Sequence, residues 1–254
     1  MKNDSKEISA VSATAGAAAA TTGAAPRFDM YGGIHKALRA LMADTLLAVG
    51  RMDADDALER AQTCQRVLQL LDACASHLKH ENEFIHTAME ARAPGASERI
   101  AHEHEEHVQH INALGAKVAA LMDSAEAGRA AAATDLYRSL SLFIAENYQH
   151  MHVEETAHNA VLQARYTDAE LIAIHDALVA SIPPQEMMTT LRWLVPFANP
   201  AERAAMLGDI RSKAPAQVFD AIIDTVRPHL SDNEWVKLAR ALQLPVAAGL
   251  VELW

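Results

Sequence analysis

Hydrophobic residues recur every three or four positions over long stretches of this chain, which is the pattern of helices with one buried face. The first two stretches span residues 28–50 and 55–91, and the next two span residues 97–124 and 132–164. Short polar or Gly- and Pro-containing segments separate them. Long consecutive helices with short links pack as antiparallel neighbours. The pattern predicts an all-α protein with an antiparallel four-helix bundle in residues 27–165.

Residues 166–254 follow a different pattern, with shorter amphipathic stretches and repeated helix-start signals. Thr167, Asn199 and Ser231 each precede a glutamate by three positions, which is the spacing of a capping box. We therefore predict a smaller C-terminal module of about five short helices. Residues 1–26 are rich in Ala, Thr, Ser and Gly, which predicts a disordered N-terminal tail.

Charge and cysteine content narrow the class of protein. The formal net charge is −11 with no basic run, and this argues against nucleic-acid binding because neutralising phosphates needs clustered Lys and Arg. The sequence contains no run of 18 apolar residues, so we expect no membrane span. Cys64 and Cys74 lie on one predicted helix, roughly 15 Å apart along its axis, too far for a disulfide between them. A reducing compartment is the default, so we expect a cytoplasmic protein.

Histidines carry the candidate chemistry. The chain has 13 of them, and two of the long helices contain a His-x-x-x-Glu pair: His77 with Glu81, and His150 with Glu154. Residues four apart in a helix lie on the same face, and both pairs fall on the apolar stripe. Burying an imidazole and a carboxylate is costly unless something satisfies them, and a divalent metal ion does so. These pairs predict a metal site in the bundle interior.

The other two long helices add further candidate ligands. His35 lies on the apolar stripe of the first helix, and His104 and His107 both lie near the inward face of the third. His104 is slightly preferred, and His107 stays an alternative. Imidazole with carboxylate suits iron, with zinc or manganese as substitutes, and dimetal sites between facing helices are an established arrangement.

The remaining histidines are interpreted as outside the metal site. His158 lies one turn beyond Glu154 on the same face, where we expect it to orient a ligand rather than bind the metal. His175 and His229 are isolated in the C-terminal module. The others are predicted to point outward: His80, His86, His102, His110 and His152.

The order H…HxxxE…H…HxxxE resembles the hemerythrin-like (HHE cation-binding) family over about residues 28–164. This resemblance implies a non-haem diiron centre with two iron ions and two bridging glutamates. The segments that carry it are 34–39, 77–83, 103–107 and 148–155. The implied ligands are His35, His77, Glu81, His150 and Glu154, with His104 or His107 as the sixth.

One departure from the family bears on function. Oxygen-carrying hemerythrins have an H-x-x-x-H on the third helix, whereas this chain has histidines at 102, 104, 107 and 110. A set of four histidines and two glutamates resembles the iron-sensing and iron–sulfur-repair branches of the family. The departure therefore shifts the expected role away from simple oxygen carriage.

Three functional hypotheses remain. The first is a metal-binding or sensor protein that binds a small diatomic ligand, dioxygen or nitric oxide, or responds to iron status. The second is an enzyme or iron donor, acting in iron–sulfur centre repair or in nitric oxide or peroxide reduction. Repair proteins of the family typically carry an N-terminal cysteine-containing domain, and residues 1–26 contain no cysteine, so this hypothesis ranks second. The third is a helical interaction protein with a structural metal, and a homodimer or protein partner would use the C-terminal module.

Overall fold

The computed structural model of this chain describes residues 27–245, and its regular elements in that range are all helices. The predicted all-α class is therefore confirmed. The predicted N-terminal tail, residues 1–26, lies outside the described residues, as does the end of the C-terminal module, residues 246–254.

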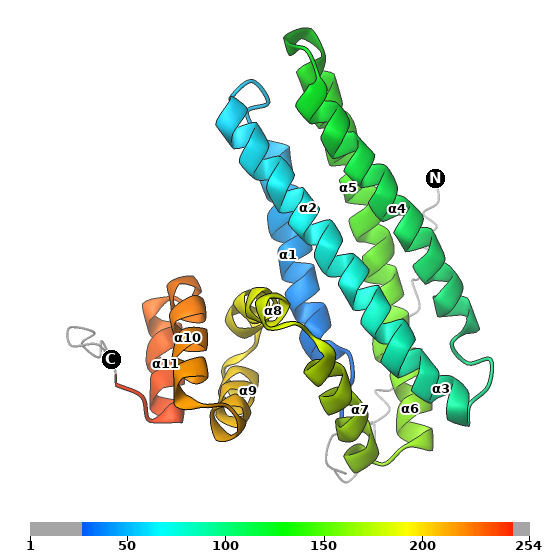
Figure 1. Ribbon diagram of the computed structural model, residues 1–254, viewed down its shortest axis with the longest axis vertical. Helices are drawn as coiled ribbons and strands as arrows, with labels where there is room; N and C mark the ends of the chain where they lie inside the picture. Colours follow the sequence, from blue (N-terminus) through cyan, green and yellow to red (C-terminus); the bar gives the residue numbers. More distant parts are fainter. Residues whose placement is uncertain (1–26, 246–254) are drawn as a thin grey trace, which may run out of the picture.

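Four long helical rods form the bundle (Figure 1). Neighbours in the chain pack against each other, and the first rod also contacts the last, which closes the bundle. The predicted four-helix bundle is confirmed. The rods consist of α1 (Gly32–Arg51); α2 (Ala57–His80) with the turn η1 (Glu81–His86) and α3 (Thr87–Arg92); α4 (Glu98–Asp123); and α5 (Glu126–Val153) with the turn η2 (Glu154–His158) and α6 (Asn159–Arg165).

The second and fourth rods each change from α-helix to π-helix at a glutamate. The first π segment runs from Glu81 to His86, and the second runs from Glu154 to His158. A π turn adds one residue to the turn and shifts the side chains that follow it, and such turns are common at functional sites. The sequence predicted two unbroken helices here, so both π turns are a difference from the expectation.

Two helix boundaries also differ from those predicted. The fourth rod begins at Glu126 rather than near residue 132, because four consecutive alanines, 130–133, favour the helix. The first begins at Gly32 rather than near residue 28. Its start is set by Asp29, whose carboxylate accepts hydrogen bonds from the backbone N–H groups of Tyr31 and Gly32.

Within the described residues up to 245, five short α-helices and one 3-10 turn, η3 (Arg227–His229), follow the bundle, in agreement with the predicted C-terminal pattern. The capping boxes at Thr167, Asn199 and Ser231 are all formed. Trp193 packs against the apolar core of the bundle, where α8 crosses α1 (Figure 1). The helices are α7 (Asp168–Ser181), α8 (Pro184–Phe197), α9 (Pro200–Lys213), α10 (Ala216–Val226) and α11 (Asp232–Leu242).

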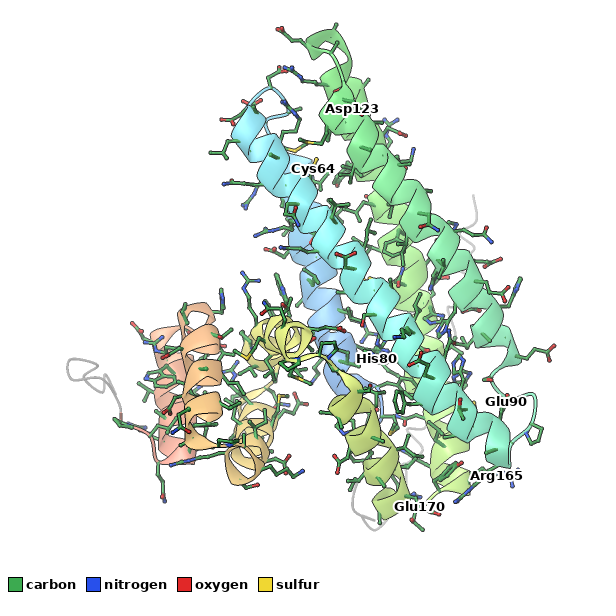
Figure 2. All side chains as sticks on the ribbon, viewed as in Figure 1. Cys64, His80, Glu90, Asp123, Arg165 and Glu170 are labelled. Carbon is green, nitrogen blue, oxygen red and sulfur yellow. The ribbon has the colours of Figure 1, made fainter. Side chains whose placement is uncertain are left out.

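Helices α8 to α11 enclose an apolar core of their own, and a third apolar cluster lies at the end of the bundle where α3, α6 and α7 meet. In that cluster Leu171 of α7 packs with Tyr31, Ile85 and Leu162 of the bundle. Figure 2 labels Glu90, Arg165 and Glu170 at this end. The division of the chain into domains at residue 165 stays a prediction.

The bundle is apolar on both sides of a buried polar layer. The larger core on one side contains Leu38, Leu70 and Phe143, and the cluster around Tyr31 and Ile85 lies on the other. Among the described helices, none is long and apolar enough to span a membrane. Cys64 and Cys74 are free thiols, as the sequence predicted, and both are buried. The polar layer contains the predicted metal ligands.

Candidate metal centre

Six of the seven predicted ligands meet in the polar layer, with contributions from all four rods. Five have almost no exposed surface, and the side chain of His77 is 12% exposed. Imidazoles and carboxylates are buried together here, and such groups need either hydrogen bonds to one another or a bound cation. The six residues are His35, His77, Glu81, His104, His150 and Glu154, and they form two groups of four that share the glutamates.

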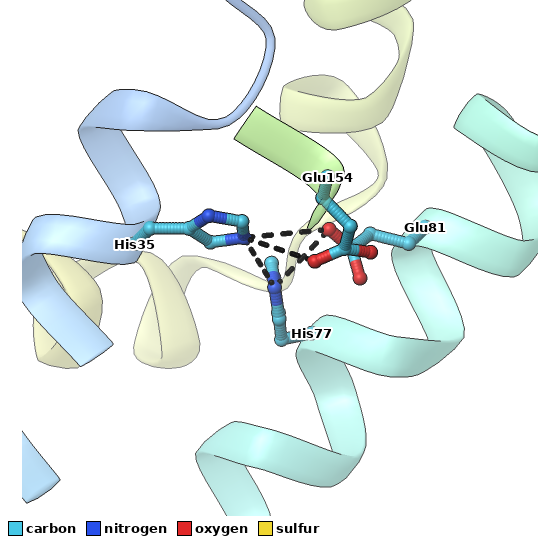
Figure 3. A group of neighbouring side chains, drawn as sticks. All are labelled: His35, His77, Glu81 and Glu154. Atoms are coloured by element: carbon cyan, nitrogen blue, oxygen red, sulfur yellow. Dashed lines mark hydrogen bonds and ion pairs between the residues drawn. The ribbon is translucent and has the colours of Figure 1, made fainter. Parts of the chain in front are cut away.

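The first group draws its imidazoles from α1 and α2 (Figure 3). Nε2 of His35 lies 3.2 Å from Nε2 of His77, which in turn lies 3.2 Å from Oε1 of Glu81. Oε2 of Glu154 lies 3.5 Å from Nε2 of His35. Two nitrogens and two carboxylate oxygens therefore converge on one point.

The second group repeats this arrangement with imidazoles from α4 and α5. Nε2 of His104 lies 3.0 Å from Nε2 of His150. Oε2 of Glu81 lies 3.5 Å from His104 Nε2, and Oε1 of Glu154 lies 3.3 Å from His150 Nε2. Each glutamate thus directs one oxygen to each group, as a carboxylate that bridges two metal ions would.

The glutamate oxygens supply a test of whether a metal fits. All four oxygens of Glu81 and Glu154 are buried, and although imidazole nitrogens lie 3.2 Å or more from them, none of the oxygens accepts a hydrogen bond. Buried carboxyl oxygens without a hydrogen-bond partner are unfavourable. Two divalent cations between the imidazole nitrogens would satisfy all four, so the residues fit a dinuclear metal centre.

Protonation in the metal-free protein partly replaces the missing positive charge. Burial lowers the pKa of His35, but its hydrogen bond to Glu155 and the charges of Glu81 and Glu154 outweigh burial and raise that pKa to about 9. Burial and the neighbouring Glu154 raise the pKa of Glu81 to about 8. Metal binding must displace these protons, so metal affinity falls as the pH is lowered.

Outer polar groups orient three of the four imidazoles. Nδ1 of His35 lies 3.1 Å from a Glu155 oxygen, and Nδ1 of His150 lies 3.0 Å from a Glu103 oxygen. Nδ1 of His104 lies 2.8 Å from the side-chain oxygen of Asn82. An oxygen acceptor at Nδ1 places the proton there and leaves the Nε2 lone pair free for a metal.

These outer carboxylates give a prediction for each half of the centre. Glu155→Gln is expected to weaken metal binding at the first group, and Glu103→Gln at the second, each by about 10- to 100-fold because the imidazole exchanges a charged carboxylate acceptor for a neutral amide. Competition with a chromophoric chelator measures both affinities. Glu105→Gln is the matched control, since its side chain is 77% exposed on α4. Affinities equal to that control would contradict the orienting role.

His107, the seventh predicted ligand, does not join either group of four. It is buried, and its ring centroid lies 4.7 Å from that of His150. His107 lines a groove of about 630 Å³ beside α4 and α5, together with Glu103 and His150. The geometry therefore favours His104 as the sixth residue of the set and places His107 between the groove and the second group.

The prediction that five further histidines point outward is correct for three of them. His102, His110 and His152 are exposed, whereas His80 and His86 are buried. The π turn that starts at Glu81 explains why His86 is buried. The extra residue in this turn brings the side chain five positions after Glu81 back to the interior. His80 lies beside Ser76, which donates a hydrogen bond to Glu186 of α8.

A signal in the sequence does point to His86 and His158. In both rods the His-x-x-x-Glu pair is followed by a further histidine, five residues after Glu81 and four after Glu154. His158 is buried, as its position one turn beyond Glu154 suggested. The repeat was visible, but α-helical spacing alone does not bring His86 inward.

The family model described as the hemerythrin HHE cation binding domain matches residues 29–162, which is more than half of the chain. The comparisons with curated proteins and with solved structures gave no significant match. The matched residues run from the start of the bundle into α6 and include both groups of four.

Proposed function

This chain belongs to the hemerythrin HHE cation-binding domain family, and from that premise we propose that its bundle holds two non-haem iron ions and binds or senses dioxygen or nitric oxide. The observation that carries the proposal is the pair of buried four-residue groups that share Glu81 and Glu154. The chain contains a cation-binding domain, and its buried His and Glu clusters are suited to a metal ion.

The donor set supports iron over a purely structural metal. Each group offers two imidazole nitrogens and two carboxylate oxygens. Four donors saturate tetrahedral zinc, whereas non-haem iron with histidine and carboxylate ligands keeps open positions. Bound ferrous iron would supply these positions and the electrons for reversible binding of a diatomic molecule. Only two carboxylates belong to the two groups, which supports ligand binding over oxidase chemistry.

Residues around the centre suit a small ligand. The groove beside α4 and α5 reaches His107 and His150, so it supplies a route from solvent to the second group. On another side, the hydroxyl of Tyr31 is buried and has no hydrogen-bond partner, and the Tyr31 ring lies 5.4 Å from that of His35 between centroids. A buried hydroxyl donor next to the centre would stabilise a polar diatomic ligand.

The proposal predicts a reversible optical response. Anaerobically purified protein loaded with Fe²⁺ is expected to contain two iron ions in the two groups of four and to show a saturable spectral change with nitric oxide or dioxygen. Removal of the gas should restore the starting spectrum without net oxidation. His152→Ala, an exposed change on α5, is the control and should behave like the unaltered protein.

Other outcomes separate the hypotheses. Irreversible oxidation with consumption of peroxide or nitric oxide, measured by stopped-flow absorption, would contradict ligand binding and favour an enzyme. Zinc as the tightly held metal, together with no spectral response after iron loading, would favour a structural role.

A further inference from the structure

A third cluster of potential ligands lies next to the two groups of four. His86, Glu154 and His158 each offer one ligand atom, and these atoms lie within 4.8 Å of one another. All three residues are buried. The two histidines belong to neither group of four, and Glu154 connects them to both.

The two histidines have polar atoms that the protein leaves unsatisfied. Nε2 of His86 and Nδ1 of His158 are both buried, and neither has a hydrogen-bond partner. The rings lie 5.7 Å apart between centroids and meet edge to face. Apolar side chains fill the next layer, where Ile85 and Leu162 belong to the cluster that closes this end of the bundle. Two buried imidazoles with free ring nitrogens are unfavourable here unless something binds them.

Local backbone geometry brings this pair together. His86 ends the first π turn and His158 ends the second, and each turn begins at a glutamate of the dinuclear centre. The two rods therefore present the same series, histidine, glutamate and histidine, to the interior. A ring stack with a centroid distance of 4.9 Å places His86 against His104 of the second group. The third cluster is thus continuous with the proposed centre.

We propose that His86, His158 and Glu154 form a third divalent-metal position. Two imidazoles and one carboxylate are a recurrent set for Zn²⁺ and Fe²⁺ with open coordination positions. Glu154 would link this ion to the dinuclear pair. Three protein donors hold an ion less tightly than four, so the third position fills last and exchanges first. The inference rests on the dinuclear centre of the proposed function only for this order of filling.

Metal stoichiometry tests the third position directly. The metal-free full chain is titrated with Zn²⁺, and bound zinc is measured by elemental analysis at stepwise increases in free zinc. The unaltered protein is expected to bind three ions, two tightly and one more weakly. His86→Asn and His158→Asn should each reduce the total to two and leave the tight pair in place. His152→Asn, exposed on the same rod as His158, should still bind three.

The outcomes distinguish this proposal from the dinuclear centre. Saturation of the unaltered protein at two ions would overturn the third position and leave the dinuclear centre intact. If the unaltered protein instead binds a single ion that depends on His86 and shows no tight pair, the dinuclear centre is overturned and the third position stands. Anomalous diffraction from zinc-loaded crystals of the unaltered protein needs no variant to fold. A zinc peak bonded to His86 and His158 is expected, and its absence at saturating zinc would also overturn the proposal.

Discussion

Replacing Glu81 with alanine is expected to empty both groups of four, so that fewer than one of their two ions remains bound per chain. Glu81 directs Oε1 towards the first group and Oε2 towards the second. Its removal leaves each group with two imidazoles and a single oxygen of Glu154. Elemental analysis after dialysis against a weak chelator measures the loss. Glu83→Ala is the matched control, because that side chain lies two residues away and is 52% exposed.

Glu81→Ala is expected to affect the stability of the metal-loaded protein but not that of the metal-free protein. Metal-free protein buries both Glu81 oxygens without a hydrogen-bond partner, so deleting the side chain should not destabilise the metal-free fold. The metal-loaded fold should lose the stabilisation that binding provides, about 4 kcal/mol for each ion at a free concentration 1,000 times its Kd. For a chain of this size the corresponding fall in Tm is on the order of 10 °C or more.

Thermal melts with and without chelator check this expectation. The unaltered protein and Glu83→Ala should show a large metal-dependent rise in Tm, and Glu81→Ala should show a much smaller one. An unchanged rise in Glu81→Ala would contradict the bridging role of this glutamate. A metal-free Glu81→Ala that melts well below the metal-free parent would instead mean that the carboxylate has a structural partner.

The bundle and most of the centre were predictable because both follow α-helical spacing. Apolar residues at three- and four-residue intervals define the buried faces, and a histidine four positions before a glutamate shares that face. His77 with Glu81 and His150 with Glu154 could therefore be found from the sequence. The relation between helices was also accessible, since short links leave antiparallel packing as the simple arrangement.

The parts that sequence reasoning missed depend on departures from that spacing. A π turn has no simple sequence signature, and its extra residue turns His86 from a predicted surface position into a buried one. The early start of α5 has a different cause, since the alanine run extends the helix through a stretch that was interpreted as a polar link. Both cases involve local backbone choices that residue polarity does not encode.

The choice between His104 and His107 could not be made from the sequence either. The two residues lie three positions apart, so their side chains point within about 60° of each other around the helix. Packing decides between them. Nε2 of His104 lies 3.0 Å from Nε2 of His150, whereas His107 lies one turn further along α4, edge to face with the rings of Phe143 and His150.

His104→Ala is therefore expected to release the ion of the second group, whereas His107→Ala should keep both ions. His104 is one of only four donors in that group, and losing a direct ligand should cost more than the roughly 10- to 100-fold effect of an outer partner. Elemental analysis and chelator competition on both variants measure the difference. The reverse pattern would require α4 to slide along α5 by three residues, about 4.5 Å. Such a shift would also separate Nδ1 of His104 from Asn82, its present partner, so the two variants test the helix register together with the ligand.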